Sequence, residues 1–212
     1  MATETKRLAQ QERADLAAFL ATLRPGQWEH ATLCRDWRVR EVVAHVLSYD
    51  ELDLCGLITR FVRARFLPDR ANALGVAEYS TYEPERLLML LNGHLCPRGL
   101  PAAFGGRIAL VDGLIHHQDI RRSLGMPRII APERLRVALS FALIAPPIGA
   151  FWRARGLRLI ATDLDWTSGR GPELRGPGEA LLLAIAGRHA ATSELSGPGR
   201  PVLVRRLGRE LG

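Results

Sequence analysis

Apolar residues recur at helical spacing through roughly the first three quarters of this 212-residue chain. The first such stripe predicts an amphipathic helix over residues 5–23, and its members are Leu16, Phe19, Leu20 and Leu23. Similar stripes, bounded by prolines and glycines, predict further helices over residues 36–65, from Pro84, over residues 107–124 and from Pro132 to Pro146. Successive amphipathic helices bury their apolar faces against one another, so the pattern predicts a helical bundle.

The pattern changes after Gly156, where glycine and proline become frequent. Residues 157–161 alternate apolar and polar positions as a strand does, residues 179–188 have helical spacing, and residues 202–207 indicate a second strand. We therefore predict a mainly α chain, with a helical bundle over residues 1–155 and a small α/β C-terminal domain over residues 156–212.

The basic charge of the chain comes almost entirely from arginine. The chain has 29 basic residues and a formal net charge of +7, and Lys6 is its single lysine. Active sites that need an internal lysine, such as a P-loop or a Schiff-base site, are therefore excluded. The arginines are spread along the chain, and aromatic residues make up only 6% of it. We therefore expect no nucleic-acid partner.

Three cysteines, Cys34, Cys55 and Cys96, form no C-x-x-C pair. This pattern argues against a disulfide framework and against a thiolate zinc site, and it is typical of a reducing compartment. The N-terminal residues lack the apolar segment of a signal peptide. The longest apolar stretch, residues 141–152, is interrupted by two prolines and is too short to cross a bilayer. We expect a cytoplasmic protein without a membrane partner, either a monomer or a homodimer.

The residues that are most informative about chemistry lie between positions 112 and 119. At about 100° per residue of helix, Asp112, His116 and Asp119 share one face, whereas His117 points toward another. A carboxylate and an imidazole one turn apart on a helix can bind one metal ion together. Because two ligands rarely make a tight site, a third is expected from another helix, and His45 is the best candidate.

The same residues also have simpler explanations. An Asp-x-x-x-His spacing occurs in surface ion pairs, and a single histidine such as His45 is more often a hydrogen-bonded core residue than a ligand. Asp119 lies one turn beyond His116, where it can orient a ligand histidine or pair with Arg122. The residues alone leave both a metal site and a packed polar cluster open.

Three segments of the chain resemble one protein family. Trp28 and residues 32–45 (TLCRDWRVREVVAH) are similar to the N-terminal signature of the mycothiol-dependent maleylpyruvate isomerase family, which belongs to the DinB/YfiT-like metalloenzymes. Residues 112–125 (DGLIHHQDIRRSLG) resemble the second signature of that family, and residues 162–197 resemble its C-terminal region. The resemblance implies a DinB-like four-helix bundle followed by a small α/β domain.

The resemblance also implies a set of site residues. The metal ligands of the family fall on His45, Asp112 and His116, which would hold a divalent ion, most readily zinc. Asp112 stands where the isomerases have a glutamate, so its shorter side chain could loosen the site. Arg188, in the Gly-Arg ending of a matching segment, is a candidate contact for the thiol or the substrate.

The implied function is an enzyme that uses mycothiol, a low-molecular-weight thiol, on a small electrophilic substrate. A metal ion favours the thiolate form of a bound thiol. The thiolate adds to a conjugated double bond and then leaves in an isomerase, or stays in the product of an S-transferase. The three cysteines of the chain, Cys34 included, are then packing residues. The alternative, from another class, is a metal-binding sensor or interaction protein without turnover.

Overall fold

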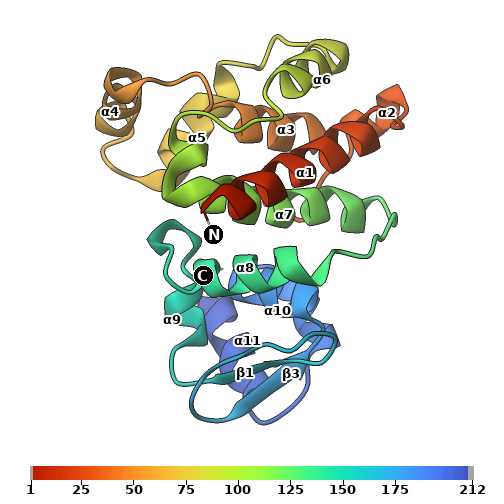
Figure 1. Ribbon diagram of the computed structural model, residues 1–212, viewed down its shortest axis with the longest axis vertical. Helices are drawn as coiled ribbons and strands as arrows, with labels where there is room; N and C mark the ends of the chain where they lie inside the picture. Colours follow the sequence, from red (N-terminus) through yellow and green to blue (C-terminus); the bar gives the residue numbers. More distant parts are fainter. Residues whose placement is uncertain (1, 210–212) are drawn as a thin grey trace. The chain divides into compact units, whose positions relative to one another are not determined.

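The computed structural model describes residues 2–209 and is mainly helical, with one small sheet near the C-terminus (Figure 1). The chain divides into two compact units, the first ending at Arg128 and the second beginning at Ile129. The predicted fold class is confirmed. Within the part of the chain that is described, no helix combines the length and the apolar character needed to cross a membrane.

A four-helix bundle forms the N-terminal unit. Its helices are α1 (Ala2–Leu20), α3 (Val39–Leu47), α6 (Pro84–Gly93) and α7 (Ala103–Ser123). Helix α1 packs against α6 and α7, and α3 packs against the same two helices, so the four elements close a ring. Figure 1 shows α1, in red, running alongside α7, in green. The remaining elements of this unit are α2 (Pro25–Trp28), α4 (Leu54–Arg63), α5 (Pro68–Ala77) and η1 (Leu100–Ala102).

The bundle core consists of the apolar stripes that the sequence shows. Its fully buried members include Leu16, Leu20, Val39, Val42, Val43, Leu87, Leu91 and Ile120. Each side chain of this size contributes about 1.5–3 kcal/mol when it leaves water completely. This apolar cluster includes residues of α1, α3, α6 and α7, and it packs these helices together.

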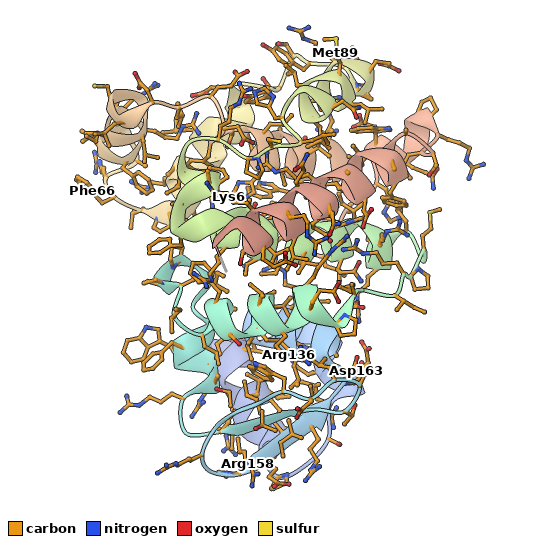
Figure 2. The ribbon with its side chains drawn as sticks, viewed as in Figure 1. Lys6, Phe66, Met89, Arg136, Arg158 and Asp163 are labelled. Carbon is orange, nitrogen blue, oxygen red and sulfur yellow. The ribbon has the colours of Figure 1, made fainter. Side chains whose placement is uncertain are left out.

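Helix α7 begins its regular course at Arg107, as the sequence predicts. Phe104, Gly105 and Gly106 have positive φ angles, which break the helical path at its start. A Cβ on Gly106 would lie 3.2 Å from the Cα of Lys6, so only glycine allows α1 and α7 to approach this closely. Figure 2 labels Lys6, the single lysine, on α1 beside this contact.

The predicted continuous helix over residues 36–65 is wrong. Helix α3 ends at Leu47, and α4 begins after Asp53, whose carboxylate accepts a hydrogen bond from the Gly56 N–H at 2.7 Å. Between the two helices, Asp50 is buried and accepts hydrogen bonds from Arg13 at 2.7 Å and from the Arg98 N–H at 2.9 Å. These distant partners hold the chain in a turn that periodicity does not reveal.

The C-terminal unit packs helices against a three-stranded sheet. Its elements are α8 (Pro132–Ala142), η2 (Pro146–Ile148), α9 (Ala150–Ala154), β1 (Arg158–Ala161), β2 (Thr167–Gly169), β3 (Glu173–Gly176), α10 (Gly178–Ile185), η3 (His189–Glu194) and α11 (Arg200–Arg209). Strand β1 lies in the middle, antiparallel to β2 and parallel to β3. Figure 2 shows Arg158 on β1 at the edge of this unit, exposed to solvent.

The predicted strand over residues 202–207 is wrong, because this segment is helix α11. Leu203 and Leu207 are buried, and Arg205 between them is exposed. A strand would turn Arg205 to the same face as the two leucines, whereas a helix turns it about 200° away from Leu203. Burying the leucines without burying the arginine therefore requires a helix.

The boundary between the units lies earlier than the predicted boundary at residue 155. Helices α8 and α9 both pack against α10, so they belong to the C-terminal unit. The helix from Pro132 is consequently not the fourth member of the bundle. That place is taken by α6, which begins at Pro84 and packs on α1 and α3.

Candidate metal centre

Two helices of the bundle bring His45, Asp112 and His116 together. His45 lies in the last turn of α3, and the other two residues lie one turn apart on α7. The Nε2 atom of His45 is 3.3 Å from Oδ1 of Asp112, and Nε2 of His116 is 3.4 Å from the same oxygen. The register of α3 is fixed at its start, where the Glu41 carboxylate accepts the N–H of Arg38 at 2.8 Å.

These spacings fit histidine–carboxylate ion pairs, and they also fit atoms that share one metal ion. Ligands at 2.0–2.1 Å from a tetrahedral zinc ion lie about 3.3–3.4 Å from one another. One donor atom from each of the three residues lies within 4.8 Å of the donor atoms of the other two. The shorter side chain of Asp112 therefore still reaches both histidines. Two imidazole nitrogens and a carboxylate oxygen are a donor set that suits zinc and related divalent ions.

Burial and charge act against each other at this centre. The side chains of His45 and His116 are 8% and 9% exposed, and that of Asp112 is 36% exposed. Burial tends to raise the pKa of Asp112, but the charges of His116 and His45 outweigh it and hold that pKa well below the usual value. Burial tends to lower the pKa of His116, but Asp112 and Asp119 raise it to about 9. The carboxylates of Asp112 and Asp119 thus favour a positive charge at His116.

Asp119 contacts the far side of the His116 ring. The distance from its Oδ2 to Nδ1 of His116 is 3.1 Å, and its side chain is fully buried. A carboxylate in this place accepts the Nδ1 proton in a hydrogen bond and so fixes the ring with Nε2 toward Asp112. Asp119 thus contacts His116, and its role in orienting that ring stays a prediction.

Aromatic rings hold the two histidines in place. The ring centroid of Trp37 is 4.9 Å from that of His45 and 6.1 Å from that of His116. Tyr49 meets His45 edge-on at 6.1 Å. Burial raises the pKa of Tyr49, and its hydroxyl donates to Asn72 at 2.7 Å. Sequence reasoning did not assign Tyr49, although its place one turn after His45 was a usable signal.

His45 differs from His116 in how its ring is held. Its Nδ1 atom is buried and has no hydrogen-bond partner among the described residues. The contacts of Trp37 and Tyr49 therefore supply the orientation that a carboxylate supplies at His116.

His117 points to another side of α7, as the helical geometry predicts. It is fully buried, its Nδ1 lies 2.9 Å from Oε1 of Glu12 on α1, and Arg121 donates to its Nε2 at 2.9 Å. Burial lowers the pKa of His117 to about 4. Arg128 also pairs with Glu12. This polar cluster joins α1 to α7 and is separate from the metal centre.

The remaining predicted residue, Arg188, belongs to the C-terminal unit. It follows α10, and its Nη1 donates to the carbonyl of Ala186 at 2.8 Å. Its role toward a thiol or a substrate stays a prediction.

The fold and the site together define a four-helix-bundle protein with a candidate histidine and carboxylate metal centre. Residues 9–95 match the family model described as the mycothiol maleylpyruvate isomerase N-terminal domain. No curated protein matches the chain by sequence. A solved structure of a histidine-to-alanine mutant of the mycothiol-dependent maleylpyruvate isomerase has a TM-score of 0.61 and 16% identity, and the match covers 93% of each chain. A second structure of that isomerase has a TM-score of 0.55 and 14% identity, with the same coverage.

The resemblance found in the sequence is therefore confirmed. Residues 9–95 are similar to the mycothiol maleylpyruvate isomerase N-terminal domain, and the chain as a whole has the fold of those isomerases. The matched segment contains His45 and ends before α7, so the two ligands on α7 rest on the geometry described above.

Proposed function

We propose that this protein is a metal-dependent enzyme that uses mycothiol to isomerise a small electrophilic substrate, in the manner of the isomerase it resembles. The observation that carries the proposal is the convergence of His45, Asp112 and His116 at the spacings of one coordination sphere. Three protein ligands leave a fourth position open, which is the pattern of catalytic rather than structural zinc sites.

Each residue of the site has a separate task in this proposal. His45, Asp112 and His116 would hold the ion, and when bound the ion supplies a positive charge that favours the thiolate form of a thiol. Asp119 keeps the proton of His116 on Nδ1, and Trp37 keeps both histidine rings in place. The greater exposure of Asp112 gives small molecules access from its side of the site.

The thiol is expected to come from outside the chain. Cys55 and Cys96 are exposed, and neither belongs to a group of potential metal ligands among the described residues. Mycothiol is the candidate because the family model and both similar structures carry its name. Whether the thiol leaves again or stays attached separates an isomerase from an S-transferase.

The test is a turnover assay with maleylpyruvate and other conjugated electrophiles, with and without mycothiol. We expect turnover in the wild type and in His30→Ala, which removes an exposed histidine, and loss of turnover in His116→Ala. Free thiol should remain constant for an isomerase and fall in step with product for an S-transferase. Turnover that needs no thiol would contradict the proposal, and so would a folded, metal-loaded protein that converts none of the substrates.

A further inference from the structure

His116 belongs to two different groups of potential ligands. One of its ring nitrogens faces Asp112 and His45, and the other faces Asp119. Cys34 completes a second group, because donor atoms of Cys34, His116 and Asp119 all lie within 4.8 Å of one another. Asp119, in the second group, contacts the ring nitrogen that does not face Asp112. Sequence reasoning interpreted Cys34 as a packing residue.

The loop between α2 and α3 holds Cys34 in this position through its backbone. The Leu33 N–H donates to the carbonyl of Asp119 at 3.3 Å, which ties the loop to α7. The Cys34 N–H donates to the Thr32 hydroxyl at 3.1 Å, and its carbonyl accepts from the Trp37 N–H at 3.2 Å. Cys34 is half-buried and Asp119 is fully buried, so the group is anchored and still reachable from solvent.

The donor chemistry of the second group differs from that of the first. Cys34 adds a sulfur to one imidazole nitrogen and one carboxylate oxygen. Thiolate ligands select soft, thiophilic cations, whereas nitrogen and oxygen donors alone show no such preference. The two groups therefore differ in the cation they prefer, although they share one histidine.

We propose that Cys34, His116 and Asp119 form a second cation site, for a thiophilic divalent ion, which excludes the ion proposed at His45, Asp112 and His116. Binding at the second site releases the thiol proton of Cys34. The cation also displaces the Nδ1 proton of His116 to solvent, and the proton that remains on Nε2 is donated in a hydrogen bond to Oδ1 of Asp112. Because a neutral imidazole has one proton and one lone pair, His116 serves one site at a time.

The proposal that the second ion excludes the first depends on the proposed function, because it assumes an ion at the first site. The proposal of a second site does not depend on it. Occupation of the second site turns the Nε2 proton of His116 toward Asp112 and so removes a ligand from the first site. A thiophilic cation should consequently inhibit the enzyme by displacing the ion of the first site.

The experiment is a titration of the metal-free full-length protein with Cd²⁺, followed by ultraviolet absorbance. A cadmium ion bound to a thiolate gives a charge-transfer band that nitrogen and oxygen ligands do not give. We expect the band in the wild type and in Cys96→Ser, an exposed cysteine of the same unit, and its loss in Cys34→Ser. His45→Ala should keep the band, because His45 belongs only to the first group.

A second measurement uses the wild type alone, so it does not depend on the folding of Cys34→Ser. In the wild type, Cd²⁺ should protect Cys34 from alkylation while Cys96 reacts at its usual rate, as read by mass spectrometry of the two peptides. Cadmium binding without the band, or a band that persists in folded Cys34→Ser, would overturn the second site. Failure of thiol-dependent turnover alone would leave the band intact, so the two proposals fail separately.

Discussion

A single carboxylate oxygen contacts both histidines of the candidate metal centre. Oδ1 of Asp112 lies within 3.4 Å of Nε2 of both His45 and His116, so the short aspartate side chain reaches both rings. His116 is held on both sides, whereas His45 depends on ring contacts. The three ligands are therefore supported unequally.

Replacement of Asp119 tests this support at the residue scale. Asp119→Ala removes the acceptor of the Nδ1 proton of His116 without removing a proposed ligand of the first site. Loss of such an orienting partner typically weakens metal affinity about 10–100-fold. Competition with a chelating dye measures the affinity, and circular dichroism checks the fold. Wild-type affinity in folded Asp119→Ala would show that Asp119 does not orient the ligand.

Helix α7 has different polar residues on two of its faces. One side presents Asp112 and His116 to α3, and the other presents His117 to Glu12 on α1. Helical periodicity is enough to predict this division from the sequence. The pairing of Glu12 with His117 is not predictable in that way, because the two residues are 105 positions apart.

Predictions from local sequence patterns were wrong where contacts with distant residues determine the structure. The break after α3 depends on Asp50 meeting Arg13, 37 residues away. The segment that forms helix α11 was predicted as a strand because the sequence does not show that Arg205 is exposed. The second ligand group was missed because Cys34 reaches His116 through a loop that carries no periodic signal. Spacing on one helix was therefore predictable, and contacts made by loops were not.

The cluster around Glu12 predicts a pH dependence of stability. Burial tends to raise the pKa of Glu12, but His117 and Arg128 outweigh it and hold the pKa below the ordinary 4.5. The pKa is thus lower in the folded than in the unfolded state. The resulting stabilisation is complete above pH 4.5 and is lost as the pH falls through the folded value.

Urea unfolding of Glu12→Gln at several pH values measures this effect. At neutral pH we expect the free energy of unfolding to fall by about 1.5–3 kcal/mol, the size of a hydrogen bond to a charged group. The difference from the wild type should shrink once the pH is below 4.5. Glu85→Gln, at an exposed position on α6, should change the free energy little. A difference that stays constant across the range would contradict the assignment.

On the scale of the whole molecule, two units each have their own core. The bundle is closed by contacts among α1, α3, α6 and α7, and the residues of the candidate metal centre lie on two of these helices. Other apolar side chains remain outside these cores. Phe66, for example, is 72% exposed beyond the end of α4, as Figure 2 shows.

The independence of the core predicts that the metal ion is catalytic and not required for folding. After exhaustive chelation, we expect the helical circular dichroism signal to persist and turnover to vanish, and a divalent ion should restore turnover. Binding to the native state should still raise the melting temperature by mass action. Collapse of the helical signal on chelation would instead make the site structural, as in small zinc domains.

In the function proposed above, His45, Asp112 and His116 bind one divalent ion together. Elemental analysis of protein purified without added metal tests it most directly, with the wild type compared with His45→Ala, His116→Ala and the exposed control His30→Ala. We expect one equivalent of metal in the wild type and in the control, and loss of that metal in the other two variants. Full metal content in folded His45→Ala and His116→Ala would contradict it.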